Sequence, residues 1–223
     1  MGSGFWECRY NGVIQVTRAS QPAPCREYHD IPLTRAGELR DVRKPYGGIN
    51  LQFETLRALV MKIMIFLHGT ILMHRNAQNR TREERVKQVL DGDKSLHDFV
   101  AYIPVGDVVP KLQAWKQQGA EIVYLSSHKK SKDVEKDKVV LQNYGFPDGQ
   151  VFFRNNNERY NEIVERVLPD ILIEDDCESI GGEIEMTYPH VRLELKNRIK
   201  SIVVKEFGGI DHLPDNISAL REC

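Results

Sequence analysis

Five short apolar runs, separated by segments with helical spacing, constrain the fold of this chain more than any other feature. The runs lie at 62–67, 121–126, 151–153, 171–175 and 201–204. Most place apolar residues at successive positions, which is typical of parallel strands that helices cover on both faces. Strands that alternate with helices form βαβ units. The sequence therefore predicts an α/β fold, a Rossmann-like three-layer α/β/α domain with a parallel sheet of about five strands.

The segments between the runs carry helical signals. The spacing of Val108, Val109, Leu112 and Trp115 predicts one helix, which Gly119 ends, and a second is expected from about 131 to 144, before Gly145. A third helix is predicted by the stripe of Ile163, Val164, Val167 and Leu168. The segment from 71 to about 102 is too long for a simple connection. We expect it to form a small helical cap insertion over the strand ends, with a charged helix whose apolar edge consists of Val86, Val89 and Leu90.

Residue composition and apolar patterning divide the chain into three parts. Residues 1–60 mix prolines and glycines with scattered charges, and only short pieces, strand-like at 13–16 and helix-like at 51–60, show a pattern. Two interpretations stay open for this part: a non-native or poorly ordered extension, or an arm that packs on the core. Residues 61–210 hold the α/β domain, and 211–223 form a C-terminal tail.

Charge and cysteine usage exclude several classes of protein. The 31 basic and 32 acidic residues give a net charge of −1, which argues against a nucleic-acid-binding protein with a large basic field. The four cysteines include no Cys-x-x-Cys pair, so we expect reduced thiols in a cytoplasmic protein. No apolar run approaches the roughly 18 residues needed to span a membrane.

Polar residues follow four of the predicted strands. In open parallel sheets, ligands bind at the carboxyl ends of the strands, so these residues should meet in one crevice. They are His68-Gly69-Thr70, Ser126-Ser127-His128-Lys129, Arg154 and Asp175-Asp176. Hydroxyls, imidazoles, a guanidinium and carboxylates are the groups that bind phosphate and metal ions.

Three of these segments resemble motifs of the haloacid dehalogenase (HAD) superfamily over about 150 residues. Residues 63–72, with Gly69-Thr70, are similar to the first motif, an apolar strand followed by Asp-x-Asp-Gly-Thr. Residues 119–127 resemble the second motif, a strand that ends in Ser or Thr. Residues 169–176 resemble the fourth, a strand that ends in acidic residues, and are loosely similar to the nucleotidase-like branch.

The first motif departs from the family at both catalytic positions. The resemblance implies an aspartate that attacks phosphorus and a second that acts as acid and base. Here Phe66 and His68 occupy those positions. Phenylalanine cannot form an aspartyl phosphate, so the family mechanism cannot run unchanged.

The resemblance implies a site built from a small set of residues. His68 and Asp175 would be catalytic, and Asp175 and Asp176 would bind Mg²⁺. The substrate would be a small phosphorylated molecule, such as a nucleotide. The residues expected to bind phosphate are Gly69, Thr70, Ser126, Ser127 and Arg154.

Three functions remain open at this point. The first is a phosphohydrolase of the HAD type in which His68 replaces an acidic residue. The second is a catalytically inactive HAD-like domain that binds a phosphorylated ligand or a partner protein. The third is a hydrolase in which His68, His128 and Asp175 hold Zn²⁺ or Fe²⁺, because two imidazoles and a carboxylate suit those ions better than Mg²⁺.

Overall fold

The chain forms two compact units. The computed structural model describes residues 6–10, 13–17, 60–155 and 157–223. The units comprise Met1–Pro45 and Tyr46–Cys223. Among the residues described, no helix is long and apolar enough to cross a membrane.

The first unit contains an antiparallel pair of strands. Strand β1 (Trp6–Tyr10) pairs with β2 (Val13–Thr17). The strand expected at 13–16 is therefore confirmed. The helix expected at 51–60 lies almost wholly outside the described residues.

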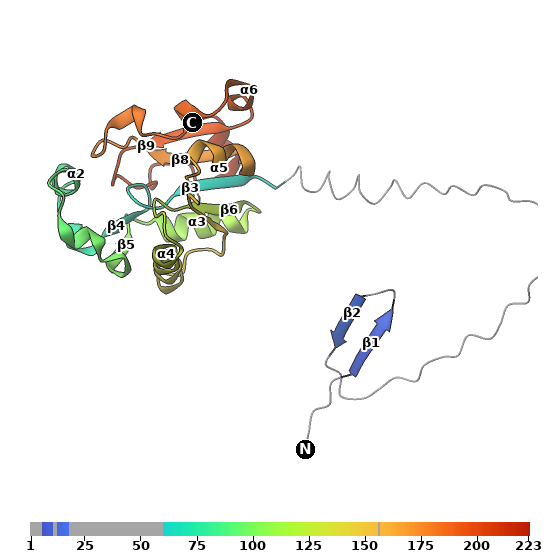
Figure 1. Ribbon diagram of the computed structural model, residues 1–223. Helices are drawn as coiled ribbons and strands as arrows, with labels where there is room; N and C mark the ends of the chain where they lie inside the picture. Colours follow the sequence, from blue (N-terminus) through green and yellow to red (C-terminus); the bar gives the residue numbers. More distant parts are fainter. Residues whose placement is uncertain (1–5, 11–12, 18–59, 156) are drawn as a thin grey trace, which may run out of the picture. The chain divides into compact units, whose positions relative to one another are not determined.

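The second unit is built on a five-stranded sheet with the order β7-β6-β3-β8-β9 (Figure 1). All four pairings are parallel. The strands are β3 (Lys62–Phe66), β6 (Glu121–Leu125), β7 (Val151–Phe152), β8 (Ile171–Asp175) and β9 (Lys200–Val204). The five runs thus form the predicted parallel sheet, and β3 at its centre has β6 and β8 as neighbours.

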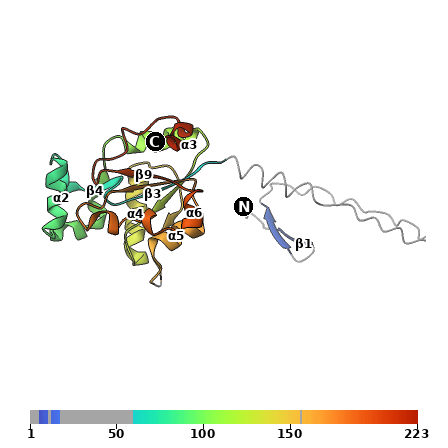
Figure 2. The same ribbon diagram turned by 90° about the horizontal axis from the view of Figure 1, so that it is seen from above.

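Alternate residues of the central strand face two helical layers. Ile63 and Ile65 join the cluster of α3 (Val108–Gln117) and α4 (Ser131–Asn143), whereas Met64 joins that of α5 (Tyr160–Val167). In Figure 2, α3 and α5 lie on opposite sides of the sheet. Burial of each large aliphatic side chain contributes about 1.5–3 kcal/mol, which explains why both faces of the strand are apolar. The α/β fold is confirmed.

The insertion between β3 and α3 stands at one end of the sheet (Figures 1 and 2). Strands β4 (Leu72–His74) and β5 (Tyr102–Pro104) pair antiparallel at its base, and α2 (Arg82–Leu90) begins with a capping box between Thr81 and Glu84. The predicted charged helix is confirmed. The insertion also contains three 3-10 turns, which are Arg75–Ala77, Lys94–His97 and Phe99–Ala101.

Two local expectations on apolar packing differ from the structure. Val86 of α2 is buried and Val89 packs beside it, but Leu90 is 64% exposed and does not belong to the apolar edge. The segment expected to be a tail places Leu213 and Leu220 in the same core cluster as the sheet. The last 3-10 turn, Ile217–Arg221, thus belongs to the packed domain.

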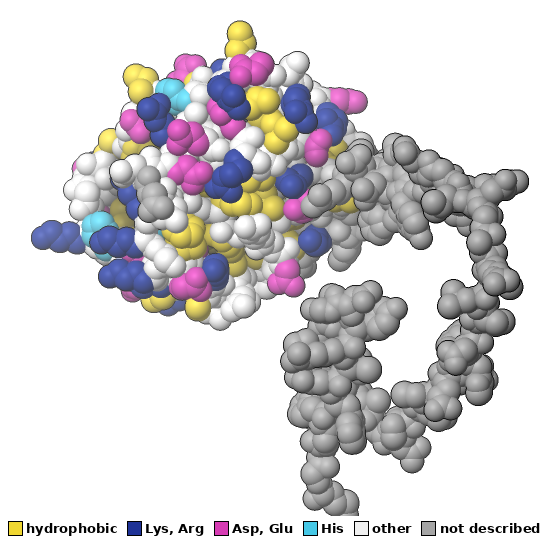
Figure 3. Space-filling view, turned by 45° about the vertical axis from the view of Figure 1, so that its right-hand side comes forward, with side chains coloured by type: hydrophobic (Ala, Val, Ile, Leu, Met, Phe, Trp, Pro, Cys, Tyr) yellow, Lys and Arg dark blue, Asp and Glu magenta, His cyan; other side chains and the backbone are white. Residues whose placement is uncertain are grey.

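A tight turn begins at Cys177, two residues after the end of β8. The amides of Ile180, Gly181 and Gly182 all donate to the carbonyl of Cys177. The 3-10 turns Gly182–Ile184 and Tyr188–His190 and the short helix α6 (Leu193–Lys196) then lead to β9. Acidic and basic side chains are interspersed over the face of this unit in Figure 3, in keeping with its balanced composition.

Candidate functional site

A cavity of about 320 Å³ opens where the carboxyl ends of β3 and β8 meet the insertion, and we call it the strand-end cavity. The end of β3 supplies Phe66, His68 and Gly69. Its other lining residues include Asp175 at the end of β8, Ser127 after β6, Tyr160 of α5, and His74, Leu96 and Tyr102 of the insertion. The cavity lies where ligands bind in open parallel sheets.

Gly69 allows the loop after β3 to lie against β8. Its φ is +85°, and a Cβ atom there would lie 2.8 Å from Oδ2 of Asp175. Only glycine adopts this backbone conformation readily while leaving room for the carboxylate. The next residue, Thr70, is fully buried and donates its hydroxyl hydrogen to the same Oδ2 over 2.7 Å.

Asp175 and Asp176 point to different surroundings. Asp175 lines the cavity, accepts from the amide of Cys177 at 3.0 Å, and has its pKa raised by burial. Asp176 lies outside the lining and pairs with Lys205 at 2.9 Å, while the amide of Glu206 donates to it at 3.0 Å. Burial pushes the pKa of Asp176 upward, but these two contacts outweigh it and hold the pKa below its ordinary value.

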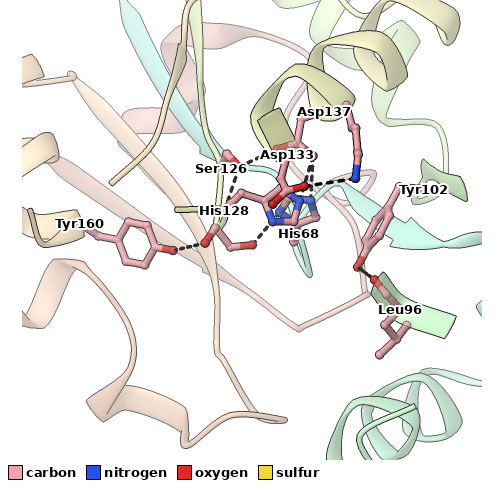
Figure 4. Close-up of polar contacts among 10 residues, drawn as sticks. His68, Leu96, Tyr102, Ser126, His128, Asp133, Asp137 and Tyr160 are labelled. Carbon is pink, nitrogen blue, oxygen red and sulfur yellow. Dashed lines mark hydrogen bonds and ion pairs between the residues drawn. The ribbon is translucent and has the colours of Figure 1, made fainter. Parts of the chain in front are cut away.

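His68 is held at both ring nitrogens (Figure 4). Its Nδ1 lies 2.8 Å from Oγ of Ser127, and its Nε2 lies 3.2 Å from Oδ1 of Asp137. The ring also packs edge-on against Tyr102 of the insertion, with centroids 5.0 Å apart. These contacts fix the direction of the imidazole at the edge of the cavity.

Asp137 joins the residues that follow β6 to those that follow β3. This buried residue of α4 accepts the hydroxyl hydrogen of Ser126 at 2.6 Å on Oδ2, and Nε2 of His128 lies 3.4 Å from its Oδ1. Burial raises its pKa, but the imidazoles of His128 and His68 beside the carboxylate outweigh that effect and hold the pKa well below its ordinary range. Asp137 was not predicted as a site residue, although a carboxylate three residues from both Val134 and Val140 falls on the apolar stripe of a helix.

The residues expected to bind phosphate lie in three different surroundings. Gly69 and Ser127 line the strand-end cavity. The hydroxyls of Thr70 and Ser126 are buried against Asp175 and Asp137. Arg154 lies elsewhere: its guanidinium stacks 4.1 Å from the ring centre of Tyr160, and it lines a separate surface groove with Lys129 and Arg159.

The donor groups do not fit a Mg²⁺ ion of the family type. Such an ion would need oxygen ligands from the ends of both β3 and β8. The end of β3 offers Phe66 and an imidazole, and Asp176 is turned to Lys205. In the described ranges, the group of at least three ligands that converges is His68, His128 and Asp137, whose ligand atoms all lie within 4.8 Å of one another.

No protein-family model and no curated protein sequence matches this chain. Among solved structures, it is similar to a chain of the Pnkp1/Rnl/Hen1 RNA repair complex, with 18% identity and a TM-score of 0.41, covering 66% of this chain and 43% of that one. A second structure of that complex matches with 16% identity and 47% of its chain covered. The chain therefore spans less than half the length of these two.

Two phosphatase structures cover more of their own length. One is a class C acid phosphatase from Bacillus anthracis with tungstate bound, with 13% identity, a TM-score of 0.45, and 79% of this chain and 84% of that chain covered. The other is phosphoserine phosphatase in its apo form, with 11% identity, a TM-score of 0.35, and 66% and 94% covered. At such identities the likeness concerns the fold alone, an α/β domain with helices on both faces of a parallel sheet.

Proposed function

We propose that this chain is a HAD-like protein of the phosphohydrolase type that takes a small phosphorylated compound in the strand-end cavity. The observation that supports it best is that His68 and Gly69 of the first motif and Asp175 of the fourth line one cavity. Its volume of about 320 Å³ is at the small end of the range of ligand sites.

The reaction would proceed without an aspartyl phosphate. Phe66 occupies the position of the attacking aspartate, and its ring packs edge-on against Tyr160 at 5.2 Å between centroids. A phenyl ring has no lone pair with which to attack phosphorus. Water would therefore be the nucleophile, and His68 would be the polar group of the first motif that acts at the phosphate.

Charge sets a condition on substrate binding. Of the described residues, those that line the cavity include Glu174, Asp175, Glu185 and Glu206, and none of them is Lys or Arg. A phosphate dianion would meet repulsion from these carboxylates. Binding therefore requires a cation, which would offset this repulsion and lower the pKa of a bound water.

A panel of phosphate esters, including nucleoside monophosphates, tests the proposal. Release of phosphate is measured with Mg²⁺, Mn²⁺ and Zn²⁺ for the full chain, for His68→Ala and for Asp175→Asn. We expect both changes to lower the rate by about 10²-fold or more. His212→Ala is the matched control, because this histidine is exposed and outside the cavity lining. Rates that are equal in all four proteins would exclude the proposed site.

The second candidate is a domain that binds the phosphorylated compound without turnover. It is favoured by Phe66 and by the hydroxyls of Thr70 and Ser126, which are bound to carboxylates rather than free for a substrate. It predicts thermal stabilisation by an ester without phosphate release, amounting to about 2.7 kcal/mol at a ligand concentration of about 100 times Kd. The same panel separates the two candidates.

A further inference from the structure

His68 and His128 come together from neighbouring strands in a way that favours a shared ion. Their ring centroids lie 4.6 Å apart, and both direct Nε2 toward Oδ1 of Asp137 (Figure 4). We propose that His68, His128 and Asp137 form a transition-metal site suited to Zn²⁺ or Fe²⁺. The third ligand is thus Asp137 of α4 and not Asp175. This inference does not depend on the proposed substrate, because the site would bind its ion without one.

The spacing of the ligand atoms fits a tetrahedral ion. Oδ1 of Asp137 lies 3.2 Å from Nε2 of His68 and 3.4 Å from Nε2 of His128. Zinc–nitrogen and zinc–oxygen bonds of about 2.0–2.1 Å at tetrahedral angles separate neighbouring ligand atoms by about 3.3 Å. The two measured spacings match this separation, and the three ligand atoms all lie within 4.8 Å of one another.

One ring nitrogen of His128 lacks a hydrogen-bond partner among the described residues. Its Nε2 is buried and has no hydrogen bond among the described residues, because its contact with Asp137 lacks the required geometry. Burying a polar atom without a partner destabilises the folded protein. Coordination of a cation would satisfy this atom.

Two serines form hydrogen bonds with the ligand residues on the sides that would face away from the ion. Ser127 lies at Nδ1 of His68, the nitrogen that would face away from the ion. Ser126 donates to the outer oxygen of Asp137 at 2.6 Å and accepts from the amide of His128 at 3.1 Å. Histidine and carboxylate ligands of metals commonly have such partners, which fix the ring orientation and strengthen binding.

The surroundings would leave one position of the ion for a small ligand. Three protein ligands and one open position are typical of catalytic zinc. His68 lines the strand-end cavity, so the open position could be reached from it. The rings of Phe99 and Tyr102 cover the histidines from the insertion, at 4.0 Å from His128 and 5.0 Å from His68 between centroids.

The competing explanation is a metal-free network in which both imidazoles donate to Asp137. The 3.2 Å contact of His68 suits a hydrogen bond, and the 3.4 Å contact of His128 would have to shorten to become one. This network would bind no ion, and changes to its members would affect stability alone.

Metal binding by the full chain decides between the two. The protein is stripped with a chelator, and Zn²⁺ or Co²⁺ affinity is measured by competition with a chromogenic chelator, without any phosphate ester. We expect one equivalent of metal and an affinity lowered at least about 100-fold in His128→Ala and about 10-fold or more in Asp137→Asn. His212→Ala, at an exposed histidine outside the cluster, should bind as the unchanged chain does.

X-ray absorption of the Zn²⁺ form should show imidazole and oxygen ligands without sulfur, which separates this site from the four cysteines. Asp137→Asn keeps the shape of the side chain and covers the case in which His128→Ala fails to fold. The inference is wrong if the folded chain binds neither ion at micromolar concentration, if sulfur is a ligand, or if Asp137→Asn binds as tightly as the unchanged chain. Phosphate release plays no part in this measurement. If metal binding fails, the proposed function is therefore still judged separately by the ester panel.

Discussion

Thr70 donates its hydroxyl hydrogen to Oδ2 of Asp175 over 2.7 Å and joins the loop after β3 to the end of β8 inside the core. The two residues are 105 positions apart, and both are buried. The bond holds the carboxylate in place at the strand-end cavity. Its loss should therefore affect both stability and the cavity.

Thr70→Val removes the donor at nearly constant shape. Asp175 would then lose this donor and keep the amide of Cys177. We expect the free energy of unfolding to fall by about 1–3 kcal/mol, the cost of leaving a buried polar group unsatisfied. Urea unfolding measures the change, and Thr70→Ser, which keeps the hydroxyl, should lose less. Equal stability of the valine variant and the unchanged chain would show that this bond contributes nothing.

Gly69→Ala tests the close approach of the same loop to Asp175. The new Cβ atom would lie 2.8 Å from Oδ2, and the residue would have to keep a φ of +85°. The left-handed conformation alone costs about 1–2 kcal/mol. Gly119→Ala is the matched control, since Gly119 has a φ of +95° and no atom near the added Cβ. We expect Gly69→Ala to lower the unfolding free energy by more than the control does, and equal losses would contradict the close approach.

The sheet could be predicted from the sequence because buried parallel strands carry an apolar signal on both faces. The run at 62–67 became the central strand, and the residues expected to meet at strand ends follow β3, β6 and β8, which are neighbours. Strands β4 and β5 were not predicted, because three residues are too few to show a period of two. Leu90 was misassigned because its helical spacing from Val86 places it on the same face of α2, whereas at the last position of the helix its side chain is 64% exposed.

The candidate site was less predictable than the fold, because position at a strand end does not determine the direction of a side chain. Asp175 and Asp176 are adjacent, yet only the first lines the cavity, since alternate residues point to opposite sides. Asp137 was missed because it reaches the strand ends from a helix. Its place among apolar neighbours was the signal, and the histidines that it binds follow two other strands.

Glu206 should make stability depend on pH. This buried carboxylate accepts from the amide and hydroxyl of Ser179 at 2.7 and 2.6 Å. Burial raises its pKa above the ordinary value, the bonds from Ser179 oppose this, and Asp175 and Asp176 raise it further. The folded state therefore binds a proton more readily than the unfolded state, whose Glu pKa is about 4.3. The stability from this group is full below that pH and is lost as pH rises through the higher folded-state pKa.

Glu206→Gln removes this titration and can keep both contacts with Ser179. We expect the melting temperature of the variant, relative to the unchanged chain, to increase as pH rises from about 4 to about 8. Differential scanning calorimetry across this range measures the difference. A difference that is constant with pH would show that the pKa of Glu206 does not change on folding.

Phe66 leads to a prediction about intermediates. Since the position of the attacking aspartate carries a phenyl ring, phosphate release should occur without a covalent phosphoprotein. The chain is mixed with a ³²P-labelled ester that it hydrolyses, quenched in acid or in alkali during turnover, and analysed for labelled protein. We expect no label under either quench, and a phosphatase with an aspartate nucleophile serves as the positive control. Label that survives acid but not alkali would indicate an attacking carboxylate such as Asp175. Label that survives alkali but not acid would indicate a phosphorylated imidazole, with His68 as the first candidate, and would show that a side chain rather than water attacks the phosphorus.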